Sequence, residues 1–145
     1  MSTFDSRPGN KPDKCLVSAC LTGLCTRYDG IAKVSPSCME CLSGYHWIPV
    51  CPEQLGGLTT PRTAADLIGG NGHDVLAGKA KVVNRDGVDV TGQFIKGAQQ
   101  CLSIAWAQGI DTAFLKTGSP SCGLTPQVGV AAALLAQHKI RLIEF

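Results

Sequence analysis

The sequence has little charge, few aromatic residues and no long apolar run. Charged residues make up 17% of the 145 residues and aromatic residues 6%, and the formal net charge is only +2. Because no block of like charge is present, we expect no nucleic-acid polymer as partner. The longest apolar stretches, such as 128–136, are much shorter than the roughly 20 residues that cross a bilayer, so we expect no membrane association either.

The chain also lacks common targeting and cofactor signatures. The N-terminal segment MSTFDSRPGNKPDK has no apolar core of a signal peptide, which predicts a cytoplasmic protein. It contains neither a phosphate-binding loop nor a dinucleotide fingerprint. The three histidines, His46, His73 and His138, do not have the spacing of a metalloprotease zinc motif. We therefore interpret them as surface or core residues rather than metal ligands.

Cysteine, by contrast, is abundant, with eight residues in a chain that fits one compact domain. This density is below that of small disulfide-bonded scaffolds. In a reducing compartment, surplus cysteines indicate metal binding or thiol chemistry more than structural disulfides. Residues 1–13 are polar and show no periodicity, so we expect a flexible arm there and a single domain over 14–145.

The apolar pattern predicts an α/β fold. We expect buried strands at 14–19, 45–50, 111–116 and 140–143, and helices from Thr91 to Gly109 and over 127–137. Residues 81–84 and 87–90 suggest a small hairpin, and 52–78 suggests a long ordered loop with one helical turn at 64–68. This order predicts a single-domain three-layer sandwich, in which helices cover both faces of a mostly parallel sheet.

Three cysteines, Cys20, Cys51 and Cys122, directly follow predicted strands. Ligands of open α/β sheets bind at the carboxyl ends of the strands, so these thiols are expected at one edge. Iron–sulfur clusters usually take four cysteine ligands, and a site with three leaves one iron open for chemistry. The alternative is that these cysteines are buried packing residues. Their glycine, proline and polar neighbours are more typical of functional loops.

The other cysteines have weaker patterns. Cys15 lies within the first strand and Cys101 on the apolar face of the long helix, so both are expected to pack in the core. Cys25 follows Cys20 closely and is interpreted as a spare thiol near the site. Cys38 and Cys41 form a CxxC motif, which could be half of a zinc site or a redox pair. Since no second CxxC is present and the motif is expected in a loop, we interpret it as incidental.

Several polar residues lie beside these cysteines. Glu53 follows Cys51 by two positions and is either a general acid–base group or a solvated loop carboxylate. Ser119 and Ser121 bracket Pro120, where a hydroxyl could hold substrate, relay a proton or only form a turn. Arginine side chains such as Arg27 and Arg62 could bind a carbonyl or an anion, or form salt bridges.

Four segments resemble motifs of a bacterial family long catalogued as a domain of unknown function, whose studied members are thiouracil desulfidases. The segments are SACLTGLCTRYDG (18–30), PVCPEQLGGLTTPR (49–62), DGVDVTGQFIKGA (86–98) and FLKTGSPSCG (114–123). SACL, CPE and SPSCG in this order are specific, and the resemblance spans nearly the whole chain beyond residue 14.

The resemblance implies a [4Fe–4S] cluster held by Cys20, Cys51 and Cys122, with the fourth iron open. It also implies non-redox desulfuration of a thiopyrimidine such as 2- or 4-thiouracil, giving uracil and sulfide. Glu53, with Ser119 or Ser121, would then activate water and protonate the ring nitrogen. Many relatives have a longer loop after SPSCG than the LTPQVGV of this chain, so we expect substrate size and selectivity to differ.

Two other functions are compatible with the same residues. The cluster could accept sulfur for transfer to another molecule, in which case sulfide is delivered to an acceptor rather than released. Alternatively the chain could be a metal- or sulfide-binding module without catalysis, in which Glu53 is dispensable.

Overall fold

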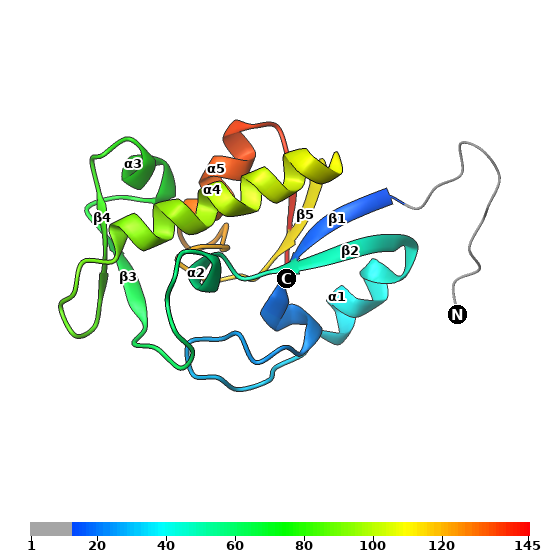
Figure 1. The fold of residues 1–145 in the computed structure, drawn as a ribbon, viewed down its shortest axis with the longest axis horizontal. Helices are drawn as coiled ribbons and strands as arrows, with labels where there is room; N and C mark the ends of the chain where they lie inside the picture. The colour runs from blue at the N-terminus through cyan, green and yellow to red at the C-terminus, as the bar shows by residue number, and fades with distance from the viewer. Residues whose placement is uncertain (1–12) are drawn as a thin grey trace.

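A four-stranded parallel sheet forms the centre of the fold (Figure 1). The computed structural model describes residues 13–145. The strands are β1 (Asp13–Ser18), β2 (Tyr45–Val50), β5 (Thr112–Leu115) and β6 (Arg141–Glu144), in the order β2-β1-β5-β6. Each neighbouring pair is parallel, which confirms the predicted sheet. The arm predicted at 1–13 lies outside the described residues, except for Asp13, which opens β1.

Helices cover both faces of this sheet, as predicted. Because side chains alternate along a strand, Leu16 of β1 packs against α4 (Thr91–Gln108) and α5 (Val130–Gln137), whereas Cys15 and Val17 pack on the opposite face. That face is covered by α1 (Pro36–Cys41) and the short 3-10 helices η1 (Ala19–Thr22) and η2 (Leu42–Gly44). In Figure 1, α4 and α5 lie on one side of the strands and α1 on the other.

The predicted ends of the longer elements are close to the observed ones. Helix α4 ends at Gln108, where Gly109 takes a φ of 64° and donates its amide to the last turn. Helix α5 begins at Val130, three residues later than predicted, because the preceding residues wrap around the turn that contains Cys122. The amide of Val130 donates to the carbonyl of Pro120 in that turn, 3.0 Å away.

A second, two-stranded sheet lies beyond the main one and corrects one prediction. Strand β3 (Ala65–Ile68) pairs antiparallel with β4 (Lys81–Asn84), so the helical turn predicted at 64–68 is wrong. Ala65 and Leu67 are half-buried against a small core while Asp66 and Ile68 are exposed, the two-residue period of a strand. The predicted hairpin of 81–84 with 87–90 is present in short form on the other edge of β4, as a bridge between Val83 and Asp89 with backbone hydrogen bonds on either side.

Besides the two 3-10 helices, three short α-helices were missed. They are α1 with the CxxC motif, α2 (Pro52–Leu55) and α3 (Gly72–Leu76). Their sequence signals are local: the Ser35 hydroxyl accepts the amide of Cys38, with Pro36 at the first helical position. Asn71 and Asp74 form a capping box at the start of α3. The long loop predicted over 52–78 therefore contains α2, β3 and α3.

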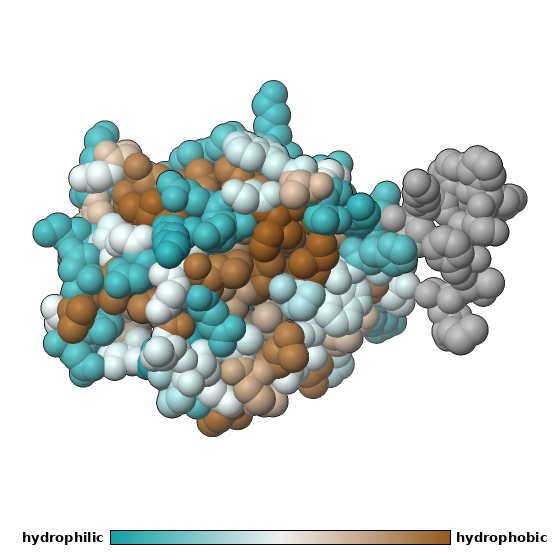
Figure 2. All heavy atoms as spheres, in the orientation of Figure 1, coloured by the Kyte–Doolittle hydropathy of each residue, from teal (hydrophilic) through white to brown (hydrophobic). Residues whose placement is uncertain are grey.

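The surface mixes apolar and polar side chains. On the face shown in Figure 2, hydrophobic residues are interrupted by hydrophilic ones. The most exposed large apolar side chains are Trp106, at 63%, and Ile31, at 61%. Within residues 13–145, no helix combines the length and the hydrophobicity that crossing a bilayer requires.

Candidate functional site

The three strand-end cysteines line one cavity at the carboxyl edge of the sheet. Cys20 lies in η1 after β1, Cys51 follows β2 at the start of α2, and Cys122 lies in the turn after β5. The cavity has a volume of about 250 Å³, and all three residues contribute to its wall. Residues remote in sequence therefore meet here because β2, β1 and β5 are neighbours in the sheet.

The chain topology explains this location. The connection from β1 to β2 runs over one face through α1, and the connection from β2 to β5 returns over the other face through α4. The chain thus changes direction between β1 and β5, and such a switch point leaves a crevice outside the carboxyl ends of the strands. Cys20 and Cys122 flank this crevice.

The thiols of the three cysteines are held in surroundings that disfavour bare thiolates. Burial raises the pKa of Cys122 to about 12. Burial and the neighbouring thiol of Cys51 raise the pKa of Cys20, and burial likewise raises the pKa of Cys51. A metal centre would compensate the charge of thiolates in such a place. Three cysteines on one cavity wall are thus a donor set that suits an iron–sulfur core.

The three cysteines are spread around the cavity wall rather than grouped about one point. Within residues 13–145, no three histidine, cysteine or carboxylate side chains converge closely enough to hold one metal ion. In an iron–sulfur cluster each cysteine binds a different iron, so the ligands stand farther apart than around one zinc ion. Within the same described residues, Cys38 and Cys41 belong to no group that could hold a metal ion.

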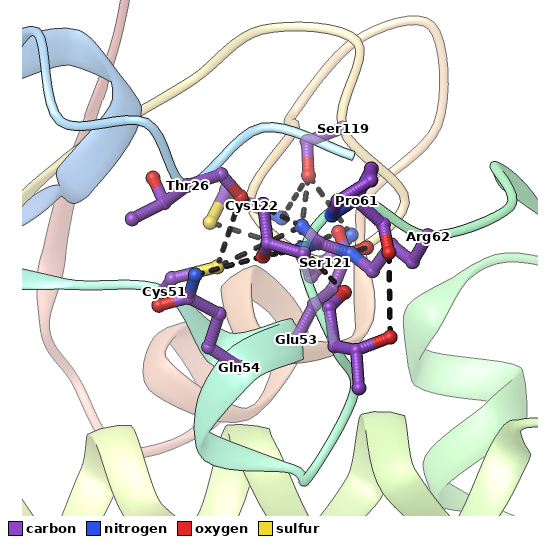
Figure 3. Close-up of polar contacts among 11 residues, drawn as sticks. Thr26, Cys51, Glu53, Gln54, Pro61, Arg62, Ser119, Ser121 and Cys122 are labelled. Carbon is purple, nitrogen blue, oxygen red and sulfur yellow. Dashed lines mark hydrogen bonds and ion pairs between the residues drawn. The ribbon is translucent and has the colours of Figure 1, made fainter. Parts of the chain in front are cut away.

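A hydrogen-bonded network joins Glu53 to both serines (Figure 3). The hydroxyl of Ser121 donates to Oε2 of Glu53 at 3.0 Å and lies 3.8 Å from Sγ of Cys122. The hydroxyl of Ser119 is 3.0 Å from that of Ser121 and accepts the amide of Cys122 at 3.0 Å. Ser121 is 2% exposed and Glu53 has a side-chain exposure of 13%, so this carboxylate is not a freely solvated one.

Arg62 forms an ion pair with Glu53 on the other side of the carboxylate. Its Nε lies 3.0 Å from Oε1 of Glu53, and its Nη2 lies 3.8 Å from Sγ of Cys51. Figure 3 shows the guanidinium group among these residues. Of the alternatives open for Arg62, the structure therefore shows the salt bridge.

Ser18 is a site residue that sequence reasoning missed. It is the last residue of β1 and only 2% exposed, and its hydroxyl accepts the amide of Lys116 at 3.0 Å. A hydrogen bond from Ser18 also counters the burial that raises the pKa of Cys122. The available signal was its position, since Ser18 precedes Cys20 at the same strand end.

The cavity wall carries more positive than negative charge. Its charged residues are the cations Arg27, Arg62, Arg85 and Lys116 and the carboxylates Glu53 and Asp66. Arg27 is paired with Asp29 at 3.0 Å, and both Lys116 and Arg27 lower the pKa of Cys20 against the larger effect of burial. An excess of positive charge suits three thiolates and an anionic sulfur ligand.

Glycines hold the cysteine-bearing turns against their supporting helices. A β-carbon on Gly129 would lie 2.5 Å from the carbonyl carbon of Ser121, so the start of α5 touches the backbone of that turn. The amide of Ala132 donates to the carbonyl of Ser121 at 3.0 Å. Only glycine permits this approach, which fixes the position of Cys122 beside the cavity.

The remaining cysteines do not line the cavity. Cys15, Cys38 and Cys101 are fully buried, and Cys25 and Cys41 are exposed. The CxxC motif lies in helix α1 rather than in the expected loop.

The histidines also lie elsewhere. His73 is hydrogen-bonded to Gln137, and His138 packs edge-on against Trp106. None of the three, including His46, contributes to the cavity wall.

Comparison with known proteins agrees with this site. Residues 15–144 match the family model described as 2-thiouracil desulfurase. The chain belongs to this family. The 2-thiouracil desulfurase family is thus the one indicated by SACL, CPE and SPSCG, and the resemblance found in the sequence is confirmed.

Two similar proteins illustrate the relationship. The chain is 40% identical over 141 residues to the uncharacterized protein YbbK of Bacillus subtilis (strain 168), covering 88% of this chain and 93% of that protein. It is also similar to a solved structure, the [4Fe–4S]-dependent thiouracil desulfidase TudS. Identity is 37% and the TM-score is 0.76, and the match covers 91% of this chain and 90% of TudS. Family and structural neighbour together support a desulfidase with an α/β fold.

Proposed function

We propose that this member of the 2-thiouracil desulfurase family is a [4Fe–4S]-dependent desulfidase, which converts 2- or 4-thiouracil and water to uracil and sulfide without net oxidation or reduction. The solved relative TudS is described as a [4Fe–4S]-dependent thiouracil desulfidase, which supports the substrate and the cofactor. Residues 14–145 form the desulfidase domain. The cavity of about 250 Å³ would hold both the cluster and the substrate, which supports a small substrate.

Cys20, Cys51 and Cys122 would hold the cluster, because these three cysteines face the cavity. When bound, the cluster supplies an iron without a protein ligand, which acts as a Lewis acid toward the soft thiocarbonyl sulfur. The surplus of basic residues around the cavity favours the anionic sulfur that leaves the ring. A reducing compartment such as the cytoplasm would keep these thiols available for the cluster.

The proton transfers would belong to Glu53 and the serines. Glu53 takes a proton from the water whose oxygen bonds to the ring carbon, and the carbon–sulfur bond then breaks. Ser121 passes a proton toward the ring nitrogen and regains one from Glu53, which holds the proton taken from water, through the hydrogen bond to Oε2. The Ser119 hydroxyl, 3.0 Å away, holds the Ser121 hydroxyl in place for this relay. The remaining proton of the new carbon–oxygen bond leaves with the sulfide. The observation that carries this proposal is the Ser121 hydroxyl, which has both Oε2 of Glu53 and Sγ of Cys122 as neighbours.

The proposal is tested on anaerobically prepared protein. We expect about four irons and a similar amount of acid-labile sulfide per chain, and formation of equal amounts of uracil and free sulfide from thiouracil. Cys51→Ala should abolish both the cluster and the turnover. Normal turnover in Cys51→Ala without a cluster would contradict the proposal.

Product analysis and one further variant separate the alternatives. Uracil formed without free sulfide, but with sulfur on an added thiol acceptor, would indicate sulfur transfer instead. Glu53→Gln should retain the iron of the wild-type protein and lose about 10²-fold or more in kcat. Full activity of Glu53→Gln would exclude a proton-transfer role for this carboxylate.

A further inference from the structure

All five N–H groups of Arg62 are directed at acceptors of the protein itself. Nε donates to Oε1 of Glu53 at 3.0 Å. Nη1 donates to Oγ1 of Thr60 at 2.7 Å and to the carbonyl of Thr59 at 3.3 Å. Nη2 donates to the carbonyl of Thr26 at 2.9 Å and lies 3.8 Å from Sγ of Cys51. A guanidinium has five such donors, so Arg62 has none left for a ligand.

Arg62 is also far less exposed than Arg85, another basic residue of the cavity wall. Its side chain is only 7% exposed, although Arg62 contributes to the wall. The side chain of Arg85, by comparison, is 68% exposed and pairs with Asp66 at 3.5 Å. Arg62 is therefore built into the protein and is not placed to recognise substrate.

The partners of Arg62 come from the different segments that make up the site. Cys51 and Glu53 belong to the start of α2, whereas Thr26 lies in the loop that follows Cys20. One planar group thus connects a predicted cluster ligand, the predicted proton acceptor and two loops. Since Ser121 holds Oε2 of Glu53, the contact of Arg62 with Oε1 leaves the carboxylate no free rotation.

We propose that Arg62 is a positioning residue that orients Glu53 for proton transfer and, through its N–H group on Cys51, raises the reduction potential of the bound cluster. This inference rests on the proposed function. Hydrogen bonds to cluster sulfurs and nearby positive charge raise the potential of an iron–sulfur centre. A lysine cannot replace the guanidinium, because a single ammonium cannot reach these acceptors in one plane.

The test compares Arg62→Gln, Arg62→Lys and wild type as cluster-loaded proteins, with Arg141→Gln as control. Arg141 is exposed at the first residue of β6, at the opposite edge of the sheet. We expect kcat of Arg62→Gln to fall by about 10–100-fold while KM for thiouracil changes by less than about twofold. Its cluster potential should become more negative, whereas Arg141→Gln should match wild type in all three quantities. Arg62→Lys should lie between wild type and Arg62→Gln in potential.

A double-mutant cycle tests whether Arg62 acts through Glu53. Adding Arg62→Gln to Glu53→Gln should reduce kcat little further, while the shift in potential persists. A raised KM with unchanged kcat, or an unchanged potential, would overturn the proposal. If Arg62→Gln does not fold, the test relies on Arg62→Lys. This variant should also show a lower kcat, a nearly unchanged KM and a more negative cluster potential than wild type. If wild type itself does not convert thiouracil, the proposed function fails, and the potentials still test the contact of Arg62 with Cys51.

Discussion

A β-carbon on Gly97 would lie 1.8 Å from the carbonyl oxygen of Pro52, so α4 and α2 touch through their backbones. Pro52 lies between Cys51 and Glu53 in the sequence. The contact of Gly97 with Pro52 therefore fixes the position of both side chains relative to the sheet. Gly56 makes the reciprocal contact, since its β-carbon would lie 2.0 Å from the carbonyl oxygen of Gln93. The segment DGVDVTGQFIKGA thus contributes to the site without contributing a wall residue of its own.

Gly97→Ala should therefore destabilise the protein and displace α2. We expect a loss of about 1–3 kcal/mol in the free energy of unfolding, because the clash is with backbone and not with a movable side chain. Iron content should fall with it. Denaturant unfolding and iron analysis measure both effects.

Gly92→Ala in the same helix is the matched control. A β-carbon there meets no atom within 4 Å, and alanine favours helix, so stability should be unchanged or higher by up to about 1 kcal/mol. Equal stability of the two variants would contradict the role assigned to the α4–α2 contact.

Ser121→Ala and Ser119→Ala should have different consequences. The Ser121 hydroxyl contacts Glu53 directly, so its loss should reduce kcat by about 10²-fold in cluster-loaded protein. The Ser119 hydroxyl accepts the amides of Ser121 and Cys122, and its loss leaves two donors of the turn unpaired. Ser119→Ala should cost about 1–3 kcal/mol in stability and lower cluster retention. If kcat per cluster instead fell strongly in Ser119→Ala and little in Ser121→Ala, the proton relay would be assigned to Ser119.

Cys101→Ala and Cys122→Ala distinguish a packing cysteine from a ligand. Both residues are buried in the same core cluster, but only Cys122 lines the cavity. We expect Cys101→Ala to keep full iron content and lose roughly 1 kcal/mol of stability. Cys122→Ala should lose the intact cluster. Iron loss in Cys101→Ala would place a fourth thiol among the ligands.

Cluster retention should rise with pH. Burial raises the pKa of Cys122 to about 12, and the pKa values of Cys20 and Cys51 are also raised, so in the protein without iron these thiols carry protons at neutral pH. Ligation needs thiolates, and each iron–sulfur bond therefore displaces a proton. Iron retained against a chelator should increase from pH 6 to pH 8.5, with proton release on cluster insertion. Retention independent of pH would contradict ligation by these buried thiols.

Sequence patterns identified the sheet and the meeting of the three cysteines, because short apolar runs lead directly to Cys20, Cys51 and Cys122. They did not reveal β3, since Ala65 and Leu67 are good helix formers and only pairing with β4 makes them a strand. Ser35 and Asn71 are typical N-cap residues, and they could have predicted the starts of α1 and α3.

The contacts of Arg62 could not be predicted in the same way. They depend on 59–62 folding back toward Thr26 and Glu53, residues 36 and 9 positions away along the chain. Ser18 ends β1 and Cys122 follows β5, so their contact depends on the pairing of these two strands. No local sequence pattern predicts it. Contacts between loops that are distant in sequence produce no hydrophobic periodicity, so sequence patterns do not predict them.

Most of the hydrophobic core, including Leu16, Phe94 and Leu135, lies away from the cavity that holds the three cysteines. In small zinc-binding domains the metal organises the chain, and removing it unfolds the protein. Here most of the apolar interior lies between the sheet and the helices and outside the cavity wall. We therefore expect variants that do not bind the proposed cluster, such as Cys51→Ala, to keep their fold, so that loss of iron and unfolding are separate events.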